Sequence, residues 1–333
     1  MHKYVLGVDG GSSKTHCALF DFDGNMIDFM KIGSTNHETL IGSYSEFGEK
    51  MGDMIREITG RNHVGIDSIH LSVLGLSGVD TKSQHSYICN EIRKIGLQDF
   101  LVCNDSFLGI KAGSKNGYGI GVINGSGCTI CGVNKSGRMF LIGGQGEFTG
   151  EPGGGGFLGY FAIRSVYNVL FREGKKTLMK DILFEKFQIR SKYEFIDVIR
   201  DNIDNHKIKV GELAKVVFEA ANNSDELALE ILQYMGNEIG ISINGVVREL
   251  GFNKDGELDV ILAGSINVKG ENDTYVDTLK KKVIGEHEDM SINFSILKQP
   301  PVAGAIVWAL EQVNGGGIFY DKIMSQFNGM QCK

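Results

Sequence analysis

Along the first hundred residues, hydrophobic and polar positions form a pattern that predicts strands separated by helices. Strands are expected at 3–8, 15–21, 26–33, 67–76 and 99–103, and the first of them is expected to be buried. Helices are expected at about 42–60 and 82–96. The first has apolar residues at a spacing of three or four, namely Phe47, Met51, Met54, Ile55 and Ile58. The chain therefore opens with a β-meander and continues with alternating helices and strands.

The second half repeats this opening and then becomes mainly helical. Strands are expected at 118–123, 128–134, 138–142, 258–263 and 291–297. Helical patterns fill about 157–250, the longest at 225–250, and further helices are expected at 274–284 and 302–313. We interpret residues 106–117 as a short junction. Strands that alternate with helices favour α/β sheets covered on both faces.

An internal repeat relates residues 4–17 to residues 118–131. The segments YVLGVDGGSSKTHC and YGIGVINGSGCTIC are identical at seven of fourteen positions, and both predict a strand, a glycine turn and a second strand. A single long offset excludes a solenoid, in which short units recur many times. The repeat therefore indicates two homologous domains. We expect the boundaries to be 1–115, joined by a C-terminal helix at 302–330, and 116–301.

Composition and charge then narrow the class of protein. The 333 residues contain 46 glycines but 3 prolines, and the net charge is −7. An acidic chain without a long basic run argues against nucleic acid or a membrane surface as the main partner. Asp9 interrupts the first apolar stretch, so we expect neither a signal peptide nor a membrane span. Six cysteines are too sparse for a disulfide framework, and we expect a cytoplasmic protein.

The two glycine turns carry the first candidate chemistry. Consecutive glycines let backbone N–H groups converge on an anion without interference from side chains. The turn at 9–14 is not a Walker A loop, because Ser13 precedes Lys14 and a strand follows. A single glycine hairpin is usually only a hairpin. Two equivalent turns, at 10–13 and 124–127, predict a pair of loops that hold one polyphosphate.

Polar residues just beyond predicted strands are the second group of candidates. Asp105 follows the strand 99–103, and α/β sheets bind ligands outside the carboxyl ends of their strands. Asp105 is therefore a candidate base, although aspartate is also common in turns and at helix N-caps. The same two interpretations apply to Asp80. Asn36 could bind a sugar hydroxyl or simply form a turn.

Two further motifs are interpreted as structural. Gly154, Gly156 and Gly159 match G-x-G-x-x-G, but no strand leads directly into them, so a glycine loop that caps a helix is the better interpretation. Cys128 and Cys131 are three apart on a predicted strand and point to opposite faces, which excludes joint metal binding and favours packing.

Together these motifs resemble those of the actin-like ATPase superfamily, which includes sugar kinases, actin and heat-shock ATPases. The chain looks most like the N-acetylglucosamine kinase branch of the BadF/BadG/BcrA/BcrD ATPase family, over essentially its whole length. Residues 7–15 and 124–127 resemble the two phosphate motifs, and residues 262–265 resemble the adenosine motif. The sugar-side motifs are matched at 34–37, 76–80, 104–106 and 143–151.

The resemblance implies a fold and a reaction. The fold would consist of two actin-like, ribonuclease H-like α/β domains. Each would have a mixed five-stranded sheet with helices on both faces, and the active-site cleft would lie between them. The implied reaction is ATP-dependent phosphorylation of an N-acetylated amino sugar, most simply at its 6-hydroxyl, with Mg²⁺ as cofactor. A homodimer is also implied.

The resemblance also assigns roles to individual residues. Asp105 would be the general base, and Asp9 would lie near Mg²⁺ and bind it through water. The implied substrate contacts are Asn36, Ser77, Gly78, Asp80, Asp105, Gly144, Gln145 and Glu151. The implied nucleotide contacts are Gly10, Gly11, Ser12, Ser13, Lys14, Gly125, Ser126, Gly127, Gly264 and Ser265.

Two departures from the family pattern bear on the substrate. Gln145 stands where the family has an aromatic residue, and Glu151 stands where it has aspartate. A larger, lactyl-bearing sugar such as N-acetylmuramic acid is therefore an alternative to N-acetylglucosamine. Two other functions stay open. One is an iron–sulfur ATPase that activates a dehydratase, although its cysteine motif is not found. The other is a sensor that binds sugar or nucleotide without turnover.

Overall fold

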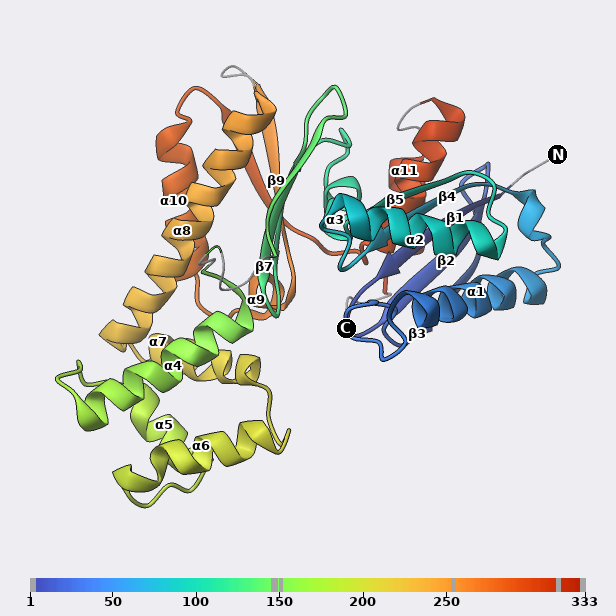
Figure 1. Cartoon of the computed structure of the whole chain (residues 1–333). Helices are drawn as coiled ribbons and strands as arrows, with labels where there is room; N and C mark the ends of the chain where they lie inside the picture. The colour runs from blue at the N-terminus through green and yellow to red at the C-terminus, as the bar shows by residue number, and fades with distance from the viewer. Residues whose placement is uncertain (1–3, 145–148, 150–151, 253–255, 316–318, 330–333) are drawn as a thin grey trace.

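The structure is a computed structural model in which two five-stranded sheets lie side by side (Figure 1). It describes residues 4–144, 149, 152–252, 256–315 and 319–329. The first sheet has the strand order β3-β2-β1-β4-β5, and the second has the order β10-β9-β6-β7-β8.

The first sheet contains the predicted meander followed by two parallel strands. Its strands are β1 (Tyr4–Gly10), β2 (Thr15–Asp21), β3 (Met26–Ile32), β4 (Ile69–Leu76) and β5 (Phe100–Cys103). β1, β2 and β3 are antiparallel, whereas β4 and β5 run parallel to β1. The helices α1 (Ser43–Arg61) and α2 (Lys82–Ile95) cover one face, and their apolar residues share a core with that face.

The second sheet has the same pattern of strands. It consists of β6 (Gly119–Asn124), β7 (Cys128–Val133), β8 (Met139–Gly143), β9 (Glu257–Ala263) and β10 (Ser291–Ile296). β6, β7 and β8 are antiparallel, and β9 and β10 run parallel to β6. The internal repeat seen over fourteen residues thus extends to the topology of both sheets.

A helical lobe is inserted between β8 and β9 (Figure 1). It comprises α4 (Gly154–Phe171), α5 (Leu178–Lys186), α6 (Phe195–Asp204), α7 (Ala214–Asn222) and α8 (Glu226–Leu250). The short helix α9 (Ser265–Lys269) follows β9, and α10 (Thr274–Glu286) packs along α8. Gly153 precedes α4, so the glycine run begins a helix, as the sequence indicates.

Residues 106–117 differ from the expected short junction, because residues 106–113 form a helix, α3 (Ser106–Gly113). Six of its eight residues are buried, so the segment lacks the periodic pattern of apolar and polar positions that identifies a surface helix. The predicted C-terminal helix also differs. α11 (Val302–Asn314) ends at Gly315, which has a left-handed conformation, and α12 (Tyr320–Gln326) is a separate helix.

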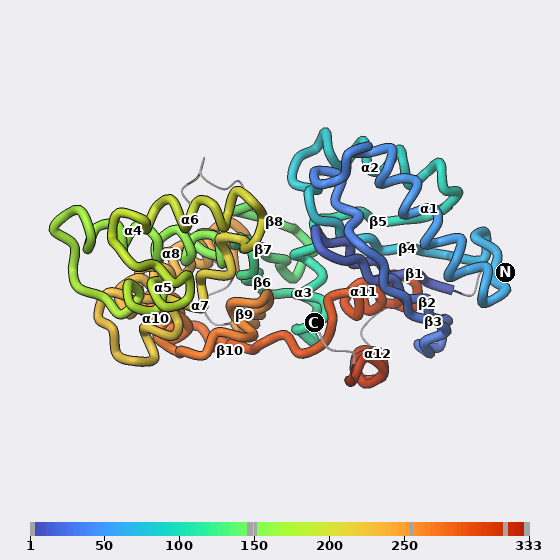
Figure 2. The backbone as a smooth tube through the Cα atoms, turned by 90° about the horizontal axis from the view of Figure 1, so that it is seen from below, coloured from blue at the N-terminus to red at the C-terminus, as the bar shows by residue number. Residues whose placement is uncertain are grey.

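α3 lies between the two sheets, and α11 packs against α3 and against the first sheet (Figures 1 and 2). Their side chains form one core with the inner faces of both sheets, from Val5 and Ala18 to Cys131 and Ile261. The two helices cross closely, because a Cβ added to Gly304 would lie 2.1 Å from the Leu108 carbonyl oxygen. The domain limits proposed from the sequence stay a proposal, since this core is continuous between the sheets.

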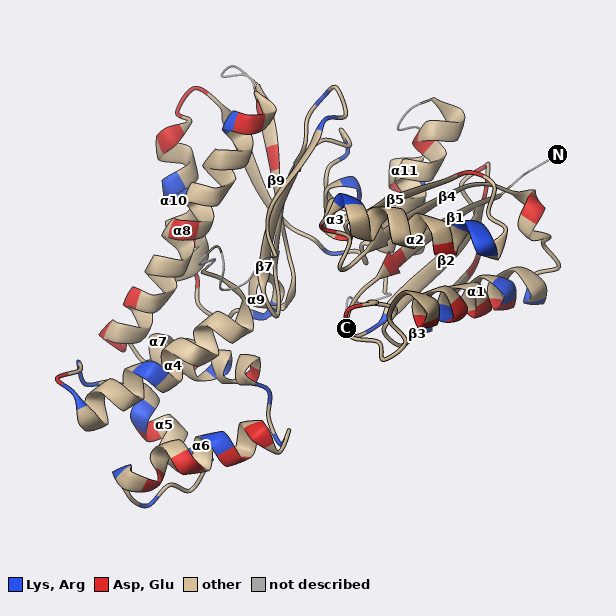
Figure 3. Ribbon diagram, viewed as in Figure 1, with Lys and Arg blue, Asp and Glu red and all other residues tan. Residues whose placement is uncertain are grey.

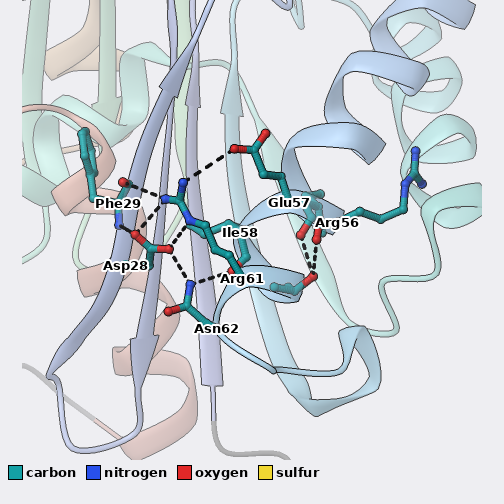
Figure 4. Close-up of polar contacts among 9 residues, drawn as sticks. Asp28, Phe29, Arg56, Glu57, Ile58, Arg61 and Asn62 are labelled. Carbon is teal, nitrogen blue, oxygen red and sulfur yellow. Dashed lines mark hydrogen bonds and ion pairs between the residues drawn. The ribbon is translucent and has the colours of Figure 1, made fainter.

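A polar cluster ties the edge strand β3 to the end of α1 (Figure 4). Arg61 donates to both carboxylate oxygens of Asp28, at 2.5 and 2.8 Å, and Asn62 donates to the same carboxylate. Burial alone would raise the pKa of Asp28, but the hydrogen bonds from Arg61 and Asn62 hold this pKa below its usual value. The cluster therefore fixes the outer edge of the first sheet.

The distribution of charged residues and the positions of two cysteines agree with what the sequence indicates. Acidic and basic residues are mixed along α1, α5 and α6 (Figure 3). Cys128 packs in the core beneath α4 and α8, whereas Cys131 packs in the core shared by the sheets, so the two thiols lie on opposite faces. Among the helices of the described residues, none is both long enough and apolar enough to cross a membrane.

Candidate active site

Two adjacent cavities lie at the carboxyl ends of the central strands. The first, which we call the carboxylate cavity, has a volume of about 310 Å³ and is lined from both sheets. Its lining includes Asp9, Lys14, His16, Asp105, Gly264 and Ser265. The position agrees with the rule that α/β sheets bind ligands beyond the carboxyl ends of their strands.

The second cavity, the outer cavity, has a volume of about 470 Å³ and belongs to the second half of the chain. The second glycine turn, the start of α4, the segment before α7 and the helix α9 form its walls. Its lining includes Gly125, Ser126, Gly155, Glu212, Lys215 and Phe218. Ser265 and Lys269 line both cavities, so the cavities meet at α9.

Asp105 occupies the N-cap position of α3, but its side chain makes no capping hydrogen bond. The neighbouring Asn104 takes that role. Its Oδ1 accepts from the Ser106 backbone N–H at 3.0 Å and from the Ser106 hydroxyl at 2.5 Å. Asp105 lines the carboxylate cavity, and its side chain makes no capping hydrogen bond.

The surroundings of Asp105 favour its protonated form. Burial raises the pKa of its carboxyl to about 7, and the negative charges of Asp9 and Asp80 add to this effect. The pKa of Asp80 is raised by burial and by Glu38, although a 2.7 Å hydrogen bond from Asn104 opposes the shift. A carboxyl that titrates near neutral pH can accept a proton under physiological conditions.

The first glycine turn is joined to the predicted sugar-side segments. The Gly11 N–H donates to the Lys14 carbonyl at 3.0 Å, which closes the turn. Asn36 Nδ2 donates to Ser12 Oγ at 2.8 Å and to Ser77 Oγ at 3.4 Å. These segments of sequence, far apart in the chain, therefore meet at one point.

The remaining residues predicted near this turn have distinct environments. Ser13 is exposed at the tip of the turn. Gly10 belongs to β1, and a Cβ there would lie 2.6 Å from Leu76 and 2.9 Å from Thr35, so it permits close packing. Gly78 has a φ of +81° and packs against Asn36.

The second glycine turn is supported by the glycine run at the start of α4. Asn124 Oδ1 accepts from the Gly154 N–H at 2.6 Å, and the Gly155 N–H donates to the Gly125 carbonyl at 2.8 Å. Gly125 and Gly127 have no atom within 4 Å of an added Cβ, so their backbone faces open space. The glycine run that begins α4 therefore borders the outer cavity and lies beyond the sugar-side motif expected at 143–151.

The predicted adenosine motif ends at the start of α9. Gly264 has a φ of +90°, and a Cβ there would lie 2.4 Å from the Asn124 carbonyl oxygen. Ser265 begins α9 and lies between the two cavities. Gly144 follows β8, near Thr129. Gln145 and Glu151 lie outside the described residues.

The structure adds site residues that the sequence did not single out. Glu212, Lys215 and Phe218 line the outer cavity, and Lys269 lines both cavities. Their segments carry ordinary helical patterns, so nothing in the sequence marks them. His16 is also new. It pairs with Asp9 across β1 and β2, and its Nδ1 lies 3.7 Å from Asp9 Oδ2.

Two sheets of identical topology, joined by crossed helices and bordered by paired glycine turns, define an actin-like fold. Solved structures agree. A Chromobacterium violaceum protein assigned provisionally as an N-acetylglucosamine kinase matches with a TM-score of 0.66 at 18% identity, covering 93% of this chain and 99% of that one. A hexokinase from Schistosoma mansoni matches with a TM-score of 0.55 at 12% identity, covering 93% and 85%. The expected fold class is confirmed.

The sequence comparisons are more specific. Residues 6–309 match the model of the BadF/BadG/BcrA/BcrD ATPase family, and the chain belongs to that family. An N-acetylmuramic acid/N-acetylglucosamine kinase from Clostridium acetobutylicum is 27% identical over 267 residues, which is 80% of this chain and 86% of that protein. An N-acetyl-D-glucosamine kinase from Dictyostelium discoideum is 26% identical over 306 residues, 86% of this chain and 92% of that protein.

Proposed function

We propose that this chain is an ATP-dependent kinase that phosphorylates an N-acetylated amino sugar, N-acetylglucosamine or N-acetylmuramic acid, at the 6-hydroxyl. The names of both curated relatives support this class of substrate. The observation that carries the proposal is the position of Asp105. Its carboxyl makes no capping hydrogen bond, has a pKa of about 7 and lies in a cavity bordered by both halves of the molecule.

In this proposal Asp105 is the general base. Its carboxylate accepts the proton of the sugar hydroxyl as the hydroxyl oxygen attacks the terminal phosphate of ATP. Phosphoryl transfer depends more on positioning and charge neutralisation than on covalent chemistry. The loop that carries Asp105 is fixed for this purpose, because Asn104 bonds to both Asp80 and Ser106.

The residues present fit a nucleotide with its magnesium ion. The open backbone at Gly125 and Gly127 lets phosphate oxygens approach the N–H groups of the second turn. Lys14 and the carboxylate of Asp9 line the carboxylate cavity, where they would hold the terminal phosphates and a hydrated Mg²⁺. When bound, Mg²⁺ supplies neutralisation of phosphate charge. Glu212, Lys215 and α9 would hold the nucleoside in the outer cavity.

The iron–sulfur alternative finds no support in the positions of the cysteines. A cluster shared between subunits needs thiols at the surface, whereas Cys17, Cys89, Cys103, Cys128 and Cys131 are all buried. Cys332 lies outside the described residues. The sensor alternative predicts binding without turnover, and a turnover assay separates it from the kinase.

The direct test measures ADP release by the purified protein with ATP, Mg²⁺ and one sugar at a time. The sugars are N-acetylglucosamine, N-acetylmuramic acid, N-acetylmannosamine, glucosamine and glucose. We expect strong stimulation by one or both of the first two. Nucleotide binding with no stimulation by any sugar would overturn the kinase and favour the sensor.

The position of phosphorylation has its own test. The 6-deoxy analogue of the best sugar lacks the proposed acceptor, so we expect it to bind without stimulating ADP release. Phosphorus–proton coupling in the product NMR spectrum should involve the protons on carbon 6. Turnover of the 6-deoxy analogue would mean that another hydroxyl is the acceptor.

A further inference from the structure

His16 is a buried polar side chain with an unsatisfied atom at the edge of the carboxylate cavity. The residue is 5% exposed and lines this cavity together with Asp9, Lys14 and Asp105. Its Nδ1 is buried and has no hydrogen-bond partner. An unpaired buried donor or acceptor costs about 1–3 kcal/mol, so this nitrogen needs an explanation.

Packing alone does not provide that explanation. The imidazole ring lies against Phe29, with ring centroids 5.4 Å apart and planes tilted by 39°. An apolar side chain of similar size would make the same contact without leaving a ring nitrogen unpaired. The contact with Phe29 does fix the ring, and Nδ1 remains within 3.7 Å of Asp9 Oδ2.

The register of β1 and β2 holds the side chains of Asp9 and His16 next to each other. Asp9 in β1 and His16 in β2 are direct cross-strand partners, so their side chains emerge side by side on one face of the sheet. Shortening 3.7 Å to a hydrogen bond of about 2.9 Å needs a movement of under about 1 Å. Such a movement is within the reach of a carboxylate that reorients when a ligand binds.

We propose that His16 is a positioning residue, whose Nδ1–H donates to the Asp9 carboxylate and orients its other oxygen toward the Mg²⁺ of the bound nucleotide. The inference rests on the role proposed above for Asp9. In this arrangement His16 acts through Asp9 and does not contact the metal itself, since its Nδ1 lies 3.7 Å from Asp9 Oδ2. Hydrogen bonds from outside the coordination sphere commonly orient a metal ligand in this way.

The test measures ADP affinity by calorimetry as a function of Mg²⁺ concentration, without sugar. His16→Leu keeps the apolar packing and removes the donor. We expect the Mg²⁺ concentration for half-maximal tightening to rise about 10-fold or more, with the affinity for metal-free ADP unchanged. His16→Asn places its amide nitrogen where Nδ1 lies, so it should restore the wild-type response. His16→Gln places that nitrogen at the position of Nε2 and should not.

His70→Leu is the control, because His70 also contacts a phenylalanine ring, that of Phe22 at 5.5 Å between centroids, but is exposed and lies at the opposite end of the same sheet. This variant should keep the wild-type Mg²⁺ response. A wild-type response in His16→Leu would overturn the inference, as would ADP binding by the wild-type protein that does not depend on Mg²⁺. If His16→Leu does not fold, the Mg²⁺ responses of His16→Asn and His16→Gln are compared instead. Equal responses in these two variants would contradict the proposal.

The Mg²⁺ dependence of ADP binding is measured without sugar, so it does not depend on which sugar the protein phosphorylates. A wild-type protein that shows the expected Mg²⁺ response but phosphorylates no sugar would refute the proposed function and leave the role of His16 standing. A protein that phosphorylates a sugar, but whose Mg²⁺ response is the same with and without His16, would support the proposed function and refute the role of His16.

Discussion

At the residue scale, the central feature is that the neighbouring residues Asn104 and Asp105 have different roles. Asn104 caps α3 and holds Asp80, while Asp105 is left without a capping bond in the carboxylate cavity. The sequence predicts that Asp105 follows a strand, but it cannot show which of two adjacent polar residues caps the helix. That choice depends on side-chain orientation, which only the packed structure fixes.

The first prediction concerns Asp105 itself. Asp105→Asn keeps the shape of the side chain but removes the proton acceptor. We expect turnover with the best sugar to fall by about 100-fold or more, with ATP affinity near that of the wild type. Steady-state kinetics and calorimetry measure the two quantities. Wild-type turnover in this variant would show that Asp105 is not the base.

The second prediction concerns pH. The base acts only when ionised, and the pKa of Asp105 is about 7 in the free protein. The value of kcat/KM should therefore be highest above this pH and fall as the pH is lowered through about 7. Asp80→Asn removes a negative charge that raises this pKa, so the acid limb should move to lower pH.

A remote carboxylate provides the control for this experiment. Asp181→Asn, on the exposed side of α5, should leave the acid limb in place. An acid limb near pH 4 in the wild-type protein, or one that stays fixed in Asp80→Asn, would contradict the assignment.

At the element scale, the two glycine turns are the parts best predicted from sequence. Turns and period-two strands are local, so the repeat at 4–17 and 118–131 was sufficient to place both hairpins. α3 was missed because it is buried on all sides, and amphipathic periodicity identifies only helices with an exposed face. The wall formed by Glu212 and Lys215 depends on how the helical lobe packs, which no local pattern encodes.

The third prediction tests the second turn. An added methyl at Gly125 meets no atom within 4 Å, and its φ is not in the left-handed region, so Gly125→Ala should fold normally. In the proposed site the methyl would instead stand where the phosphates approach, and we expect a loss of nucleotide affinity of about 10-fold or more. Thermal unfolding and calorimetry measure both effects together.

Gly285→Ala is the matched control, since Gly285 on α10 is equally unobstructed but distant from the cavities. It should preserve nucleotide affinity. If Gly125→Ala binds nucleotide as well as Gly285→Ala does, the second turn does not contact the phosphates.

At the scale of the whole molecule, α3 and α11 carry the chain between the sheets and cross at Gly304. The alternation of strands and helices predicted α/β sheets, and the internal repeat predicted two similar units. It did not show that they share a core, because that core joins Val5 to Ile261 across most of the sequence. Contacts of this kind arise from tertiary packing alone.

The fourth prediction concerns this crossing. A methyl at Gly304 would overlap the Leu108 carbonyl, so Gly304→Ala must push the two helices apart. We expect a loss of stability of about 1–3 kcal/mol, seen as a lower unfolding midpoint. Gly285→Ala again serves as the control, and its midpoint should be no lower than that of the wild type, because alanine favours a helix over glycine. An unchanged midpoint in Gly304→Ala would show that the crossing can relax without cost.

The repeated strand topology bears on the number of nucleotides that one chain binds. Each sheet supplies one glycine hairpin, so a simple doubling of a nucleotide-binding half would predict two nucleotides per chain. The helical lobe that walls the outer cavity, however, is inserted after β8, and the equivalent position after β3 holds α1, whose apolar face packs on its own sheet. We therefore expect the two halves to contribute different parts of a single nucleotide site, so that a titration with ADP reaches saturation at one equivalent per chain, whereas saturation at two equivalents would contradict this.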